Sequence, residues 1–260
     1  MLTQKISFDN PTGLKLAALL DLPDDDEPIA FALFAHCFTC SKDYKGVVRI
    51  SKALAAEGFG VLRFDFTGLG ESEGEFAETT FSSNVDDLIA AAEHMERSLE
   101  APKILIGHSL GGVAVIHAAG RLPSVVAVAT LAAPANLSRL AGLLRSQTSG
   151  VEASGEVEVE IGGRPIRIGK DLVDGLEEVN MQDAVSGLGR ALLVCHSPVD
   201  RTVAIDNATE IFSAARHPKS FLSLDSADHL LSDAADARYA GSMIATWARR
   251  YVETPVAHSL

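Results

Sequence analysis

Short apolar runs alternate with longer amphipathic segments along most of the 260 residues. Continuous apolar runs bounded by glycine, proline or polar residues are typical of strands buried inside a parallel sheet. Segments in which apolar residues return every three or four positions are typical of helices that pack on such a sheet. The expected strands lie at about 3–9, 14–22, 29–35, 60–66, 103–107, 125–131, 191–196 and 220–224. The expected helices lie at about 47–57, 83–99, 110–120, 204–215 and 234–252.

This alternation predicts an α/β fold, with a mostly parallel sheet and helices on both of its faces. In such folds the loops after the carboxyl ends of the strands carry the functional residues. The alternation of strands and helices is interrupted between about residues 135 and 189. There, residues 156–168 alternate strictly on either side of Gly162-Gly163, which predicts a β-hairpin. We therefore expect a single domain over residues 1–260 with a small cap insertion at about 135–189.

Composition narrows the class of protein. Hydrophobic residues make up 47% and charged residues 22% of the chain, which is ordinary for a soluble globular enzyme. The formal net charge of −13 argues against nucleic acid or an anionic membrane as a partner. The N-terminus lacks the core of a signal peptide, and no apolar stretch approaches the roughly 20 residues of a membrane span. Three cysteines, few and odd in number, fit a reducing compartment, so we expect a cytoplasmic protein.

Two segments fit the pattern Gly-x-Ser-x-Gly, one around Ser72 and one around Ser109. Ser109 lies between an apolar strand and an apolar helix, and a serine on such a tight turn projects its hydroxyl at the helix N-terminus. The unpaired N–H groups there favour developing negative charge. Ser72 is flanked by Glu71 and Glu73, whose charges oppose an oxyanion, and no apolar helix follows it directly. We therefore predict Ser109 as the nucleophile and the Ser72 segment as a polar loop.

A serine nucleophile needs a base and an acid that orients the base. Asp200 follows the strand that ends at His196, and His229 follows the next strand along the chain. We predict His229 as the base and Asp200 as the orienting acid. Rival bases are His94, His217 and His258, and rival acids are Asp206, Asp225 and Asp228.

The oxyanion hole is expected to use the N–H of Leu110, which follows the nucleophile, and the N–H of Phe38, in the loop after the strand at 29–35. Cys37-x-x-Cys40 in that loop also fits a redox dithiol, but the next helix starts several residues too late for that context. We therefore favour buried packing for both cysteines, without a part in hydrolysis. The eight histidines lack zinc-like spacing, so we expect neither a metal nor a cofactor.

Together these pieces resemble the α/β-hydrolase family of serine hydrolases, over nearly all of residues 1–255. The chain order Ser109, Asp200, His229 is the order of that family. The motifs are HCFT at 36–39, DFTGLG at 65–70, GHSLG at 107–111 and HSPVD at 196–200. The longer strings FAHCFTCSKD at 34–43 and ADHLL at 227–231 look like the hydrolase half of bacterial proteins fused to an OsmC-type peroxide-stress domain. The resemblance implies an α/β-hydrolase fold, esterase-like activity and an OsmC-type domain as a partner; it departs from the family at Cys37, where glycine is usual.

We therefore expect a serine carboxylesterase that forms an acyl-enzyme from a small-molecule ester. Perhydrolase or haloperoxidase-like acyl transfer fits the same residues; the residues would also serve a peptidase, although no feature specifically supports one. The alternative of another class is a non-catalytic binding module in a peroxide-stress assembly. The cap resembles inserts of cinnamoyl and feruloyl esterases, but residues 135–189 contain no Phe, Tyr, Trp or His, which favours a small aliphatic acyl group. The sequence leaves a homodimer open.

Overall fold

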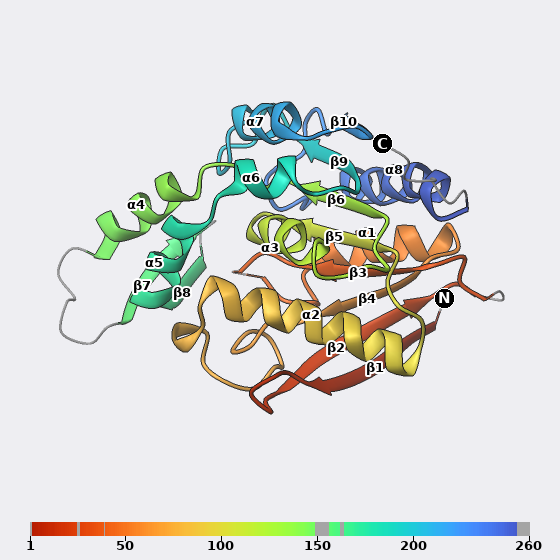
Figure 1. Ribbon diagram of the computed structural model, residues 1–260, viewed down its shortest axis with the longest axis horizontal. Helices are drawn as coiled ribbons and strands as arrows, with labels where there is room; N and C mark the ends of the chain where they lie inside the picture. The colour runs from red at the N-terminus through yellow and green to blue at the C-terminus, as the bar shows by residue number, and fades with distance from the viewer. Residues whose placement is uncertain (1, 25–26, 39, 149–155, 162–163, 254–260) are drawn as a thin grey trace.

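An eight-stranded sheet forms the centre of the molecule (Figure 1). The computed structural model describes residues 2–24, 27–38, 40–148, 156–161 and 164–253. The sheet has the order β1-β2-β4-β3-β5-β6-β9-β10; β2 is antiparallel to β1 and to β4, and all other neighbours are parallel. The strands are β1 Leu2–Asp9, β2 Lys15–Leu22, β3 Phe31–Ala35, β4 Gly60–Phe64, β5 Ile104–His108, β6 Ala127–Leu131, β9 Ala191–His196 and β10 Lys219–Ser223.

Burial along the strands explains why the hydrophobic pattern predicted them. Every residue of β3, β4, β5, β6 and β9 is buried, as continuous apolar runs require. β1 and β2 lie at one edge of the sheet instead; β1 is mostly exposed, and β2 has buried residues between more exposed ones along most of its length. All eight predicted strands are therefore confirmed, and so is the α/β fold class.

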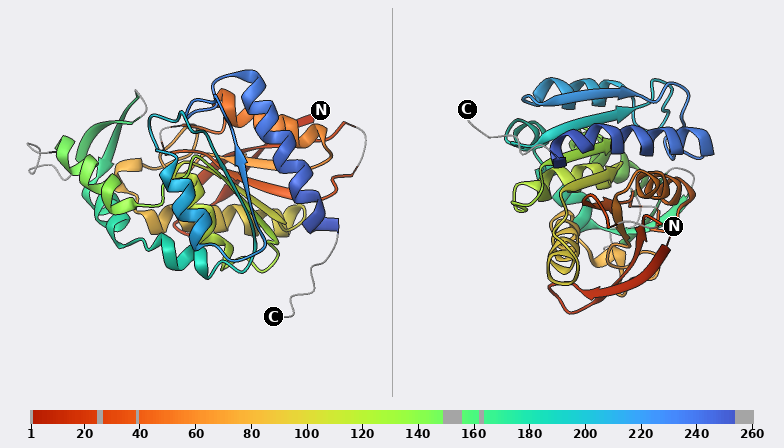
Figure 2. Two further views of the ribbon diagram at one scale, coloured as in Figure 1. Left: turned by 90° about the horizontal axis from the view of Figure 1, so that it is seen from above. Right: turned by 90° about the vertical axis from the view of Figure 1, so that its right-hand side faces the viewer.

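Helices cover both faces of the sheet (Figure 2). α1 (Lys45–Ala56) and α8 (Ala234–Glu253) pack against each other on one face. α2 (Phe81–Ser98), α3 (Leu110–Ala119) and α7 (Asp206–Ala214) share the hydrophobic core on the other face. α2 begins earlier than predicted because Thr80 caps it, its hydroxyl accepting the N–H of Ser83. In the described part of the chain, no helix is both long and apolar enough to cross a membrane.

In its described residues, the insertion between β6 and β9 contains the predicted hairpin and three helices. Its elements are α4 Leu137–Thr148, β7 Glu156–Ile161, β8 Arg164–Gly169, α5 Lys170–Glu178 and α6 Met181–Ser186. β7 and β8 pair antiparallel, which confirms the hairpin; the glycine pair at its turn lies outside the described residues. α5 and α6 were not predicted, because nine and six residues are too short for a helical period to stand out.

The insertion lies beyond the carboxyl ends of the parallel strands (Figure 1). It packs on the short 3-10 helix η1 (Phe76–Glu78): a Cβ at Gly169 would lie 2.0 Å from the carbonyl oxygen of Ala77. Ile168 is buried in the same core as α2 and α3, and Ile166 is half-buried against that core. The hairpin is therefore anchored to the body of the protein at the edge where functional loops were expected.

Candidate active site

Ser109 lies on a sharp turn between β5 and α3. Its φ of 54° and ψ of −122° are unfavourable for a residue with a side chain. The neighbouring glycines make the turn sterically feasible. A Cβ at Gly107 would lie 2.3 Å from the carbonyl oxygen of Gly111, and a Cβ at Gly111 would lie 2.4 Å from that of Ala35. The predicted strand–turn–helix context of Ser109 is thus confirmed, with the strain held at the serine itself.

The structure brings Ser109, His229 and Asp200 together from the ends of three strands. His229 Nε2 lies 3.2 Å from Ser109 Oγ, and His229 Nδ1 lies 2.8 Å from Asp200 Oδ2. An ionised carboxylate only accepts hydrogen bonds, so Nδ1 carries the proton and Nε2 is free to accept the serine proton. Asp200 and His229 are 8% and 9% exposed, so little water competes for these bonds. The arrangement can transfer a proton from the hydroxyl to the ring.

Asp200 is held in place by the backbone that follows it. Its Oδ1 accepts N–H groups from Thr202 at 2.8 Å and from Val203 at 2.9 Å. Burial alone would raise the pKa of Asp200, but the hydrogen bond and the charge of His229, together with these two N–H groups, lower it below its ordinary value. The carboxylate therefore stays ionised and stabilises a positive charge on the ring of His229.

His108, the residue before the predicted nucleophile, supports the loop of His229. Its Nε2 donates to the backbone carbonyl of His229 at 2.7 Å. Burial and the neighbouring charge of His229 lower the pKa of His108 to about 3, so this ring remains neutral. The supported loop is irregular, with Asp225 and Leu231 at φ of 29° and 50°. Sequence reasoning missed His108 because it occupies the variable position of the Gly-x-Ser-x-Gly pattern.

The two predicted oxyanion donors belong to neighbouring segments. Leu110 is the first residue of α3, directly after Ser109. Phe38 lies in the loop after β3, next to β5 in the sheet, and its buried ring packs edge-on against Phe66 and Phe76 at 5.3 and 5.5 Å. The role of their N–H groups in binding an oxyanion stays a prediction.

Cys37 and Cys40 form a disulfide, which the sequence analysis did not foresee. Their predicted burial is confirmed, at 4% and 5% exposure, but they are not free thiols. With His108 they form a cluster of potential metal ligands whose atoms lie within 4.8 Å of one another. Thiolate is the sulfur species that ligates metals, and the disulfide consumes both thiols, so we assign no metal to this cluster.

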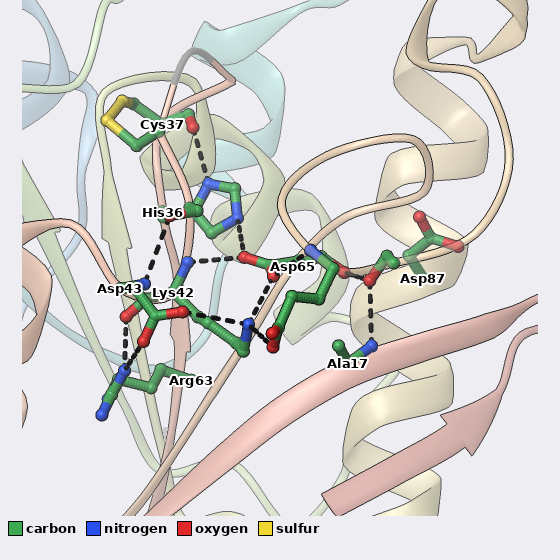
Figure 3. A network of polar contacts seen from close by, with 12 residues as sticks. Ala17, His36, Cys37, Lys42, Asp43, Arg63, Asp65 and Asp87 are labelled. Carbon is green, nitrogen blue, oxygen red and sulfur yellow. Dashed lines mark hydrogen bonds and ion pairs between the residues drawn. A yellow bond between two sulfur atoms is a disulfide. The ribbon is translucent and has the colours of Figure 1, made fainter. Parts of the chain in front are cut away.

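A network of polar contacts fixes the rest of this loop (Figure 3). His36 Nδ1 donates to the carbonyl of Cys37 at 2.6 Å, and its Nε2 lies 3.5 Å from Asp65 Oδ1. The buried Lys42 reaches Asp65 at 2.9 Å and Glu71 at 2.7 Å. Burial would raise the pKa of Asp65, but His36, Lys42 and the N–H of Glu71 lower it to about 2. This ionised carboxylate ties the predicted oxyanion loop to the loop after β4.

The rival serine, histidines and aspartates that the structure describes do not take part in the Ser109–His229–Asp200 arrangement. Ser72 Oγ donates to the carbonyl of Asp65 at 2.6 Å and accepts the N–H of Ala17 at 2.9 Å, in the polar loop that was predicted. His94 stacks on Phe8 from α2, while His217 precedes β10. Among the described residues, none of the rivals Asp206, Asp225 and Asp228 contacts His229 in the manner of Asp200; His258 lies outside them.

Known proteins resemble the chain in both sequence and fold. Residues 33–151 match the profile of a family described as "Serine aminopeptidase, S33". The esterase domain of a Rhodothermus marinus protein is 49% identical over 97% of this chain and 100% of that chain, with a TM-score of 0.81. Est1E from Butyrivibrio proteoclasticus, solved with ferulic acid bound, is 20% identical over 93% of this chain and 98% of that chain, with a TM-score of 0.80. At that identity the likeness is one of fold alone.

A curated relative matches a shorter segment. Mouse palmitoyl-protein thioesterase ABHD10, mitochondrial, is 36% identical over 92 residues, which make up 33% of this chain and 30% of that protein. The chain thus matches less than a third of the length of this relative.

The similarity to the Rhodothermus marinus domain extends over that whole domain, and this chain therefore belongs to the α/β-hydrolase family. The predicted family and fold are confirmed. The relatives support a hydrolase of the esterase or thioesterase type.

Proposed function

We propose that this chain is a serine carboxylesterase that cleaves esters of small aliphatic acids through an acyl-enzyme. The observation that supports it most strongly is the hydrogen-bonded series Ser109–His229–Asp200, with 3.2 and 2.8 Å between its polar atoms. Its position at the carboxyl ends of the parallel strands fits the active sites of α/β folds. The 49% identical esterase domain adds support for the class of substrate.

The residues would act in two half-reactions. Ser109 Oγ attacks the ester carbonyl while His229 Nε2 accepts its proton, and Asp200 stabilises the imidazolium that forms. The N–H groups of Leu110 and Phe38 are the proposed donors to the oxyanion. The alcohol leaves with the proton from Nε2, and the acyl group remains on Ser109. Water, deprotonated by His229, then releases the acid and restores the serine.

The insertion supports a small aliphatic acyl group. Its described residues on the body side include Ile166 and Ile168, and residues 135–189 contain no aromatic side chain for stacking on a cinnamoyl ring. Phe66 and Phe76, whose rings contact that of Phe38, are both buried. Neither ring is therefore exposed for stacking on a cinnamoyl group.

Thioester hydrolysis is a second candidate, favoured by the palmitoyl-protein thioesterase named among the relatives. A thioester carbonyl meets the same nucleophile, base and oxyanion donors, so the chemistry of the site does not separate the two. Acyl length separates them, because a palmitoyl chain needs a far longer apolar channel than an acetyl group. The OsmC-type domain stays a prediction from the sequence resemblance.

A panel of acyl donors tests the proposal. For p-nitrophenyl esters from acetate to palmitate, we expect kcat/KM to be highest between acetyl and hexanoyl and to fall for longer chains. Methyl ferulate and palmitoyl-coenzyme A serve as competing substrates. A maximum at methyl ferulate or at chains of about twelve or more carbons would refute the small-acyl proposal. Palmitoyl-coenzyme A as the best substrate would establish thioesterase activity. Absence of turnover with every donor would refute the proposed hydrolase activity.

A further inference from the structure

The disulfide between Cys37 and Cys40 encloses Phe38, the predicted oxyanion donor. The carbonyl of Cys37 and the N–H of Phe38 belong to one planar peptide group, and in a trans peptide they point in opposite directions. The carbonyl accepts two hydrogen bonds, from His36 Nδ1 at 2.6 Å and from the N–H of Cys40 at 3.0 Å. The turn that the disulfide closes therefore sets the direction of the Phe38 N–H.

The sulfur atoms also lie beside the support of His229. A ring nitrogen of His108 is within 4.8 Å of both sulfurs, and Nε2 of the same ring donates to the carbonyl of His229. The disulfide thus lies between the segment of the proposed oxyanion donor and the loop of the proposed base. A displacement of the sulfurs would therefore shift both the segment that carries Phe38 and the support of the His229 loop.

Reduction requires such a displacement. Two thiols that are not bonded need more room than a disulfide, in which the sulfurs are about 2 Å apart. The surroundings are closely packed, since Cys37, Cys40 and His108 are all less than 6% exposed. Either the backbone at Cys37 and Cys40 or the ring of His108 has to shift to accommodate the dithiol.

We propose that Cys37 and Cys40 form a reversible oxidation site whose disulfide state supports turnover better than its dithiol state. The activity difference rests on the proposed esterase function. The oxidant is a low-molecular-weight disulfide. One cysteine thiolate attacks it and releases one small thiolate; the second cysteine thiolate then attacks the mixed disulfide and releases the other. Two electrons pass from the protein to the small disulfide, and the two protons of the cysteines end on the two small thiols.

The test compares the full chain after incubation with oxidised glutathione and after incubation with dithiothreitol. Alkylation under denaturing conditions followed by mass measurement should find one free thiol, Cys195, in the oxidised protein and three in the reduced protein. Removal of reductant and renewed oxidation should restore the first count. With p-nitrophenyl acetate, kcat should fall about fivefold on reduction and recover on oxidation, since the oxyanion donor acts mainly on kcat.

Two variants serve as controls. Cys195→Ala removes the buried thiol on β9 and should keep the full response to reductant. The double variant Cys37→Ser with Cys40→Ser should not respond, and its kcat should match that of the reduced protein. Equal kcat in both states, with thiol counts of one and three verified, would overturn the coupling to turnover. A thiol count that does not change would overturn the oxidation site. If neither state cleaves any ester, the proposed function has failed, and the thiol count alone decides the oxidation site.

Discussion

Residues 70–74 and 107–111 share the pattern Gly-x-Ser-x-Gly, yet the structure gives their serines different tasks. The hydroxyl of Ser72 hydrogen-bonds to two backbone groups: it donates to the carbonyl of Asp65 and accepts the N–H of Ala17. The hydroxyl of Ser109 has an imidazole nitrogen 3.2 Å away. A hydroxyl bound on both sides by backbone stabilises a loop, whereas one that faces a basic ring can lose its proton.

The two segments also differ in where the backbone is strained. In the loop, the glycines take the positive φ angles, 57° at Gly70 and 91° at Gly74. In the turn before α3, the serine takes the positive φ, and the glycines are needed because other backbone atoms approach them closely. The shared pattern thus specifies small residues on a tight turn, while the residues opposite the serine specify the chemistry.

The largest effect should separate the two serines directly. Ser109→Ala should lower kcat by about 10⁴-fold or more with the fold intact, because the proposed nucleophile is lost. Ser72→Ala should keep turnover within about twofold and lower the free energy of unfolding by about 1–2 kcal/mol, through two lost hydrogen bonds to backbone. Kinetics with p-nitrophenyl acetate and urea denaturation measure both. Near-normal turnover in the Ser109 variant with loss in the Ser72 variant would reverse the assignment.

Asp200→Asn tests the next member of the series. An amide that presents its NH₂ to Nδ1 of His229 favours the tautomer that cannot accept the serine proton, and kcat should fall by about a thousandfold or more. Asp206→Asn is the matched control, since Asp206 is a rival acid exposed in the first turn of α7. Its kcat should stay within about twofold. Equal losses in the two variants would show that Asp200 is not the orienting acid.

Alanine substitutions at Gly111 and Gly120 test the close packing of the turn that carries Ser109. In Gly111→Ala, the new Cβ would lie 2.4 Å from the carbonyl oxygen of Ala35 and 2.5 Å from that of His36. We expect the free energy of unfolding to fall by about 3 kcal/mol, along with a loss of turnover. Gly120, at the other end of α3, has φ of −66°, and beyond its chain neighbours no described atom lies within 4 Å of the place a Cβ would take. Gly120→Ala should therefore be neutral or slightly stabilising. Similar stability of both variants by thermal unfolding would contradict the packing argument.

The smallest effect concerns acid stability at the loop after β4. The pKa of Asp65 is lowered from 3.8 to about 2 in the folded protein, so its contribution is present above pH 4 and is lost as the pH falls toward 2. That contribution amounts to about 2 kcal/mol. Urea denaturation between pH 5 and pH 2.5 should show a shallower loss of stability for Asp65→Asn than for the unaltered protein. Equal slopes would show that Asp65 has an ordinary pKa in the fold.

The sequence predicted what depends on local pattern. Continuous apolar runs predicted the buried strands, and the positions of Ser109, Asp200 and His229 after β5, β9 and β10 placed them at one edge of the sheet. Contacts between residues far apart in the sequence could not be predicted from local pattern. His108 and the carbonyl of His229 are 121 positions apart, and Lys42 meets Glu71 across 29. The spacing of Cys37 and Cys40 suits a free dithiol and a disulfide equally, so only the folded loop distinguishes them.

We propose that Ser109, and not Ser72, carries the activated hydroxyl. A fluorophosphonate probe reacts covalently with a serine whose proton can be removed by a neighbouring base, and peptide mapping by mass spectrometry locates the label. We expect one label per chain on the peptide that contains Ser109, and its loss after Asp200→Asn or denaturation. A label on the peptide that contains Ser72, or none on the native protein, would contradict it.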